Sequence, residues 1–318
     1  MILQSSSRIC GIESLLPKGQ ILNEDIGYNQ NWIGRIGINS RYIAQSSDRL
    51  DEFAKLASVN LCDSLSWSMA DIDVCVVVTQ TPDSQLPGIA IHLQHLLGLR
   101  EDAICFDINL GCSGYPYGLY VVGSLLEKTK GKGLLITGDF SSRIIDPLDT
   151  ATFPIFSDGI AVTALAYEAD STMMFSLHTD GQGSKAIHCP NPGALTMDGM
   201  AVFSFALAQI PLHINRFVAE TAIDSSDIDQ VFLHQANKMI SEGIIRRLDW
   251  PKALFPTTLM KYGNTSSASI PLTICDHYAN AAKASKQLAL LTGFGVGLSW
   301  GSAVVQLDND MLINTAFQ

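Results

Sequence analysis

The sequence predicts an α/β fold assembled from two similar halves. Apolar strand-like segments alternate with helical ones along the chain, and three segments of the first part recur in the same order in the second. With 318 residues, of which 47% are hydrophobic, the chain is long enough for two such halves. We expect an N-terminal half at 1–172 and a C-terminal half at 173–318.

The first half alternates between helices and buried strands. In 71–80 an acidic turn leads into a β-branched strand that is apolar throughout, and such a strand is typical of a sheet that is covered on both faces. We therefore expect mainly parallel sheets covered by helices. The expected elements are a helix over 47–66, the strand at 71–80, a helix over 88–97, a strand at 103–110, a helix after Cys112, and strands at 132–140 and 157–167.

The second half repeats the order of these strands. DIDQVFLHQ at 227–235 matches DIDVCVVVT at 71–79, an offset of 156 (227 − 71). KQLALLTGF at 286–294 echoes KGLLITGDF at 132–140, and SWGSAVVQL at 299–307 echoes SDGIAVTAL at 157–165. Three echoes in one order indicate a duplicated α/β unit.

Charge and composition exclude several classes of function. A net charge of −11 argues against general binding to nucleic acid or to an anionic membrane. The N-terminus resembles no signal peptide, and no run of about 18 uninterrupted apolar residues predicts a membrane span, so we expect a cytoplasmic protein. Seven dispersed cysteines predict reduced thiols, with neither a metal site nor a disulfide framework.

Cys112 lies in DINLGCSGYPYGL at 107–119, between an expected strand and an expected helix. A helix N-terminus favours the thiolate and lowers the pKa of a cysteine there. The flanking glycines, Gly111 and Gly114, would allow a substrate to approach the backbone closely. The segment is therefore a candidate seat for a nucleophile, although a buried core cysteine is the commoner role for this residue type.

Two polar residues of the second half occupy comparable places. His234 ends a buried strand in VFLHQANKMI, and Asn237 opens the next expected helix. Asn264 follows Gly263 in a turn before a serine-rich helical start. Taken alone, such a histidine is more often structural, and Asn beside Gly is more often a simple turn.

Together these motifs resemble the 3-oxoacyl-(acyl carrier protein) synthase III family of the thiolase superfamily. The resemblance covers 11–307 and rests on GCSGYPYGL, HQANKMI, YGNTSSASIP and GFGVGLSWGSAVV, with NWIGRIGI and LTMDGMAVF in support. It implies a thiolase-like fold, in which the two halves form a layered αβαβα arrangement. It also implies an acyltransferase of fatty-acid or specialised-metabolite synthesis.

The resemblance assigns the chemistry to Cys112, His234 and Asn264. Cys112 would accept an acyl group from a thioester. His234 and Asn264 would stabilise the enolate formed when a malonyl-carrier-protein thioester loses carbon dioxide, and that carbanion would attack the acyl-Cys to give a 3-oxoacyl thioester. The backbone N–H groups of Cys112 and Val296 would hold the oxyanion. No cofactor is implied, since coenzyme A or carrier-protein pantetheine thioesters are the substrates.

The remaining implied contacts concern substrate and partners. Trp32, Arg35 and Asn237 match substrate-binding positions, but Thr150 stands where many members have an arginine, which favours a carrier protein over coenzyme A as acyl donor. The loop Gly295–Gly297 departs from three consecutive glycines through Val296. Leu86 matches a residue that reaches across the family's homodimer into the partner's acyl pocket. Acyl carrier protein, being acidic, would dock on Lys238, Arg246 and Arg247.

Two other functions stay open. The chain could be a non-condensing acyltransferase that passes the acyl group from Cys112 to an alcohol or amine. It could also be a non-catalytic partner subunit, although the intact nucleophile argues against that role. A degradative thiolase is disfavoured because 294–301 lacks a second cysteine.

Overall fold

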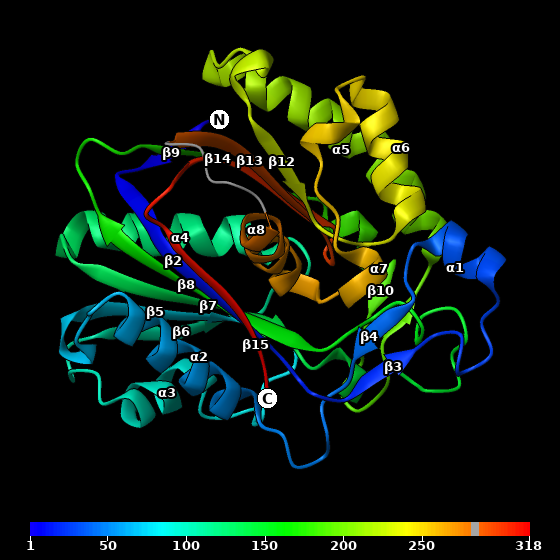
Figure 1. Cartoon of the computed structure of the whole chain (residues 1–318), viewed down its shortest axis with the longest axis horizontal. Coiled ribbons are helices and arrows are strands. Elements are labelled where there is room, and N and C mark those ends of the chain that lie inside the picture. Colours follow the sequence, from blue (N-terminus) through cyan, green and yellow to red (C-terminus); the bar gives the residue numbers. More distant parts are fainter. Residues whose placement is uncertain (281–285) are drawn as a thin grey trace.

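A computed structural model describes residues 1–280 and 286–318, which form two sheets separated by helices (Figure 1). Among these residues the first sheet has six strands, in the order β15–β2–β8–β7–β5–β6. Their bounds are Leu312–Phe317 (β15), Ser7–Leu16 (β2), Gly159–Tyr167 (β8), Lys132–Asp139 (β7), Ile72–Val78 (β5) and Ile104–Ile108 (β6).

The second sheet has five strands in the described chain, in the order β1–β9–β14–β13–β12. Their bounds are Leu3–Ser5 (β1), Met173–Thr179 (β9), Ser299–Asp308 (β14), Lys286–Gly295 (β13) and Gln230–Leu233 (β12). In the described chain, two small sheets of two antiparallel strands each lie outside these two. They pair β3 (Gln20–Leu22) with β4 (Ser40–Tyr42), and β10 (Ile187–His188) with β11 (Thr196–Met197).

The helices complete five layers. In Figure 1, α8 (Ser269–Asn280) and α4 (Gly114–Thr129) lie between the two sheets, and both contact strands of each. The outer helices are α2 (Leu50–Ser64) and α3 (Ile89–Leu97) on the first sheet, and α5 (Gly199–Thr221), with α6 (Lys238–Leu248) packed on it, on the second. The short helices α1 (Gln30–Ile36) and α7 (Leu259–Tyr262) lie near α6 and β4 respectively. The predicted αβαβα arrangement is thus confirmed.

The expectation of mainly parallel sheets is wrong, because both sheets are mixed. β5 is parallel to β6 and β7, and β12 is parallel to β13. β8 and β14, however, run antiparallel to both of their neighbours. No crossover helix joins β7 to β8 or β13 to β14, and an antiparallel pair needs only a turn or loop.

The duplication is visible in the strand order. The series β2–β8–β7–β5 and β9–β14–β13–β12 have the same order and the same sequence of antiparallel, antiparallel and parallel pairings. The terminal strands cross between the sheets, since β1 pairs with β9 and β15 pairs with β2. The division at residue 172 stays a prediction.

Several core elements carried no sequence prediction, and β2 and α5 are examples. Glu13 interrupts the apolar pattern of β2. It is buried, and its carboxylate accepts a 3.0 Å hydrogen bond from Asn314. α5 contains Pro211 and is, of the helices in the described chain, the one long and apolar enough to cross a membrane. Its fully buried Ile210 and Ile214 belong to the core against the second sheet, which accounts for that apolar character.

Candidate active site

Cys112 lies between β6 and α4, next to the ends of β5 and β13. Helix α4 begins at Gly114 with Ser113 as its N-cap residue. A Cβ atom at Gly114 would come within 2.4 Å of a methyl group of Val78, and one at Gly295 within 2.7 Å of the Cys112 Cβ. The glycines therefore permit the close approach that buries Cys112 to 8% exposure.

Burial dominates the ionisation of this thiol. Removal from water, reinforced by the nearby negative charge of Asp139, raises the pKa of Cys112 to about 12. The expectation of a lowered pKa is thus not met, because desolvation outweighs the helix N-terminus. The resting nucleophile is a thiol, so its proton must move when the sulfur attacks.

His234 directly follows β12 and is 1% exposed. Burial lowers its pKa to about 3, so the imidazole is neutral. Its Nδ1 lies 2.7 Å from the hydroxyl of Ser269, which also accepts a 3.3 Å hydrogen bond from the Gln235 backbone N–H. A hydroxyl that accepts from Gln235 can donate its own proton to Nδ1. That arrangement leaves the proton of the ring on Nε2.

Asn264 is held by its backbone beside 155–157. Its N–H donates to the Ile155 carbonyl at 3.0 Å, and its carbonyl accepts from the Ser157 N–H at 2.9 Å. The side-chain oxygen accepts a 2.9 Å hydrogen bond from the backbone N–H of Ser266. Because that oxygen is occupied by a donor, the side-chain nitrogen is the group free to donate to a substrate.

The structure brings Cys112, His234 and Asn264 together around one cavity of about 50 Å³. The other walls are mostly apolar, which suits an acyl group. LTMDGMAVF, one of the supporting motifs, contributes three of the lining residues. The walls include Ile155, Phe156, Ile187, Met197, Gly199, Val202, Ala236, Asn237, Ile240, Phe294 and Gly295.

The predicted loop residue Val296 lies beside this cavity rather than on its wall. Gly295 is the loop residue packed against Cys112, whereas Val296 and Gly297 line a neighbouring cavity of about 700 Å³. The oxyanion role of Val296 stays a prediction. Asn237 lines the small cavity and caps α6, because its side chain accepts from the Ile240 N–H at 2.9 Å.

Trp32 and Arg35 both belong to α1. Trp32 is half-buried and its ring centroid lies 4.4 Å from that of Tyr28, while Arg35 is exposed. The Tyr28 hydroxyl donates to the Thr150 carbonyl at 2.9 Å, which places Thr150 beside this aromatic pair.

The three predicted docking residues differ in their surroundings. Arg246 and Arg247 are exposed in the last turn of α6. Lys238 is half-buried and donates to the Gly34 carbonyl at 2.8 Å, so it ties α6 to the helix that carries Trp32. Leu86, the predicted dimer residue, is 85% exposed.

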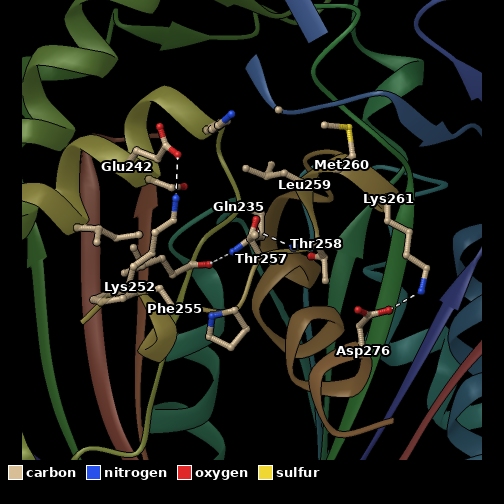
Figure 2. A pocket seen from close by; sticks show the side chains of 16 residues that line it. Gln235, Glu242, Lys252, Phe255, Thr257, Thr258, Leu259, Met260, Lys261 and Asp276 are labelled. Carbon is tan, nitrogen blue, oxygen red and sulfur yellow. Dashed lines mark hydrogen bonds and ion pairs between the residues drawn. The ribbon is translucent and has the colours of Figure 1, made fainter. Parts of the chain in front are cut away.

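A third cavity, of about 330 Å³, lies between α6 and α7 (Figure 2). Gln235 forms part of its wall. The Gln235 side-chain oxygen accepts hydrogen bonds from the Thr257 hydroxyl at 2.9 Å and the Thr258 N–H at 3.2 Å, as Figure 2 shows. Lys252 and Lys261 at this cavity are paired with Glu242 and Asp276.

Sequence reasoning missed three polar residues at the site: Ser266, Ser269 and Asp139. The serines were visible only as a serine-rich start of a helix. Asp139 carried a signal, since it is a lone acid at the end of the otherwise apolar strand KGLLITGDF. Within 1–280 and 286–318, no group of three or more His, Cys, Asp or Glu residues is arranged to hold a metal ion.

Comparison with known proteins agrees with this geometry. The model of the 3-oxoacyl-(acyl-carrier-protein) synthase III family matches residues 106–181, and that of the family's C-terminal region matches 218–307. The chain is 33% identical over 322 residues to the β-ketoacyl-(acyl-carrier-protein) synthase III of Streptococcus agalactiae serotype III, covering 95% of this chain and 99% of that one. The chain belongs to the synthase III family.

Solved structures give the same result. The 3-oxoacyl-(acyl-carrier protein) synthase of Burkholderia xenovorans superposes with a TM-score of 0.94 at 30% identity, covering 100% of this chain and 99% of that one. The synthase III of Pseudomonas aeruginosa gives 0.88 at 28% identity, with 95% and 98% covered. The chain is therefore a synthase III-like condensing enzyme with the thiolase-like fold of this family.

Proposed function

We propose that this synthase III-type enzyme performs a decarboxylative Claisen condensation through an acyl-Cys112 intermediate. The observation that carries the proposal is the set of groups around one cavity: a buried thiol, a buried imidazole and an amide whose oxygen already accepts a hydrogen bond. A nucleophile and two neutral donors of hydrogen bonds are what acyl transfer and enolate formation require.

The steps follow from these groups. The Cys112 sulfur attacks the acyl thioester and expels the pantetheine thiol. A malonyl-carrier-protein thioester then replaces the leaving group, and its carbonyl oxygen accepts hydrogen bonds from His234 and Asn264 as carbon dioxide departs. The resulting carbanion attacks the acyl-Cys carbonyl, and the bond from that carbon to the Cys112 sulfur breaks to give a 3-oxoacyl thioester. The Cys112 sulfur leaves as a thiolate and takes up a proton from solvent, which restores the thiol. Backbone N–H groups of Cys112 and Val296 hold the tetrahedral oxyanion.

The proposed partner is an acyl carrier protein, docked on the exposed Arg246 and Arg247. Lys238 contributes by holding α1 and the Trp32 and Arg35 it carries. The missing arginine at Thr150 favours carrier-linked acyl donors over coenzyme A. The pathway is fatty-acid or specialised-metabolite synthesis in the cytoplasm.

The same proposal includes a homodimer. β6 is an edge strand of the first sheet, and its Ile104 is 38% exposed. Leu86, in the loop between β5 and α3, is 85% exposed. An apolar edge of this kind is suited to pairing with a second copy of the chain. Leu86 would then reach the acyl cavity of the partner.

Intact-mass spectrometry with acyl thioesters tests the proposal. The expected result is a single acyl adduct on Cys112 that disappears when malonyl-carrier protein is added, with release of carbon dioxide. Transfer of the acyl group to an alcohol or amine without carbon dioxide would indicate the non-condensing acyltransferase. No adduct from any coenzyme A or carrier-linked donor would indicate a non-catalytic subunit.

A further inference from the structure

Ser266 touches all three of the candidate catalytic residues. Its hydroxyl lies 4.0 Å from the Cys112 sulfur, and its N–H donates to the Asn264 side-chain oxygen at 2.9 Å. Its backbone also lies near enough to accept a hydrogen bond from the His234 ring. Ser266 has a φ of 52°, in the left-handed region that non-glycine residues rarely adopt. Strain of this kind concentrates at functional sites.

Behind Ser266 lies a buried carboxylate at the end of β7. Asp139 is 2% exposed, and its Oδ1 accepts hydrogen bonds from the Thr79 hydroxyl at 3.0 Å, the Gln80 N–H at 2.6 Å and the Thr81 hydroxyl at 3.3 Å. The Ser266 hydroxyl is near enough to stabilise the carboxylate. The other oxygen, Oδ2, is buried and accepts no hydrogen bond of ordinary length within the described chain.

We propose that Ser266 and Asp139 form a relay that removes the proton of Cys112 during acylation. As the sulfur bonds to the acyl carbon, the thiol proton passes to the Ser266 oxygen and the Ser266 proton passes to Asp139 Oδ2. The bond between the acyl carbon and the pantetheine sulfur then breaks. The proton returns through Ser266 to that sulfur, which leaves as a thiol.

The charge of the buried site explains why a carboxylate is suited to this task. An ionised Asp139 opposes a second negative charge on the Cys112 sulfur, and burial penalises each. If the proton moves from Cys112 to Asp139, the site holds one negative charge throughout. His234, the other ionisable group at this cavity, stays neutral and remains a donor for the later decarboxylation.

The relay and a purely electrostatic role of Asp139 predict opposite effects of Asp139→Asn. If Asp139 only repels the thiolate, removing its charge makes Cys112 more reactive. If Asp139 accepts the proton, the same change slows the alkylation of Cys112 by about 10²-fold, which is the lower end of the range for a lost general base. Alkylation of the Cys112 peptide by iodoacetamide at pH 7, followed by mass spectrometry, measures this sign without requiring any acyl donor.

Matched variants separate the relay from damage to the fold. Asp158→Asn removes another fully buried carboxylate, which accepts hydrogen bonds from the Ser142 hydroxyl and the Ala44 N–H and does not line the Cys112 cavity. Ser267→Ala removes the neighbouring hydroxyl, which faces the Val78 carbonyl. Both controls are expected to alkylate within about threefold of the wild type, whereas Ser266→Ala, which keeps the backbone contacts, slows alkylation about as much as Asp139→Asn.

The double variant Ser266→Ala with Asp139→Asn is expected to be no slower than either single variant, because both changes interrupt one path. Unchanged or faster alkylation by Asp139→Asn, equal slowing in the two controls, or multiplied effects in the double variant would each overturn the relay. The relay rests on the proposed acyl-Cys112 chemistry. Failure of acylation with normal alkylation would instead overturn the proposed function, so the two failures are distinguishable.

Discussion

The strand pairs β5–β7 and β12–β13 occupy equivalent places in the two halves but end in different chemistry. Val78 pairs with Thr137, and Leu233 pairs with Thr292. In both β7 and β13 this threonine is followed by a glycine, but the next residue differs: it is Asp139 in the first half and Phe294 in the second.

The partners of these two residues differ accordingly. Asp139 receives a hydrogen bond from Thr79, which directly follows β5. Phe294 packs edge-on against His234, which directly follows β12, with ring centroids 5.5 Å apart. One scaffold therefore surrounds a carboxylate with donors in one half and keeps an imidazole neutral against an aromatic ring in the other. The proposed chemistry needs both, a proton acceptor for acylation and donors for decarboxylation.

The strongest test of this division between acylation and decarboxylation is a substitution of Asn264, in the second half, for which we expect the largest effect. Asn264→Ala removes a donor to the enolate, so malonyl decarboxylation should fall by about 10²- to 10³-fold. Acylation of Cys112 should remain within about threefold of the wild type, since Asn264 does not act on the thiol proton. Carbon dioxide release and intact mass measure the two steps separately. Equal loss of both would show that Asn264 is structural.

A slightly smaller effect is expected where the two halves touch. Gly295→Ala places a methyl group 2.7 Å from the Cys112 Cβ, so the nucleophile must shift. A displacement of this order should slow acylation by about 10²-fold. Gly199→Ala, on the wall of the same cavity with no atom within 4 Å of the added methyl group, is the matched control. Normal acylation by Gly295→Ala would show that the loop can move to accommodate the methyl group without displacing Cys112.

The buried histidines of the second half should make stability sensitive to acid. Burial lowers the pKa of His213, as of His234, to about 3, whereas the unfolded residue titrates near 6.5. Between these values the unfolded chain binds the extra proton, so stability falls as pH falls below 6.5. Each histidine contributes about 1.4 kcal/mol per pH unit, a tenfold change.

Urea unfolding at pH 6 and pH 5 checks this dependence. His213→Gln should reduce the loss between these values by about the contribution of one histidine. Glutamine can also keep a hydrogen bond to Ser302, which lies 3.0 Å from the His213 ring. An unchanged slope in His213→Gln would show that this histidine is already protonated or accessible in the folded state.

The smallest effect concerns the surface of α6. Reversing charge at Arg246 and Arg247 to Glu should raise the KM for a carrier-linked donor by about fivefold at low salt, and less at high salt. The same variant should leave the KM for the corresponding coenzyme A thioester unchanged. Lys252→Glu, outside the last turn of α6, is the comparison variant. A parallel change with both donors would place the carrier protein elsewhere.

Much of this fold could be predicted because its signals are local. The apolar strands and the repeated segments predicted helix-covered sheets and a duplicated unit, and the resemblance to the family predicted the five layers. The relative direction of neighbouring strands was predicted wrongly. It depends on whether the connection between two strands is a loop or a crossover helix, and the repeated strand patterns do not show this. The offset of 156 also pairs His234 with Val78, whereas strand pairing makes Thr79 its counterpart (234 − 79 = 155). The one-residue difference corresponds to the register shift between Ile72 and Val74.

The site was predicted where motifs carry it and missed where only packing does. Cys112, His234 and Asn264 lie at the ends of recognisable segments, and they line one cavity. The protonation of Cys112 was predicted wrongly, because desolvation depends on how closely Gly295 approaches, which no local pattern records. Ser266 and Asp139 lie 127 residues apart (266 − 139), so their proximity follows only from the way the halves are packed together.

The pairing of β15 with β2 has a consequence for synthesis on the ribosome. Glu13 in β2 is satisfied by Asn314 in β15, a residue 301 positions later. Until β15 leaves the exit tunnel, β2 presents an unpaired edge beside the other strands of the first sheet, and Glu13 lacks one of its two amide partners, Asn314 and Asn60. The nascent first half is thus open to pairing with another chain, and β15 closes this edge when it pairs with β2.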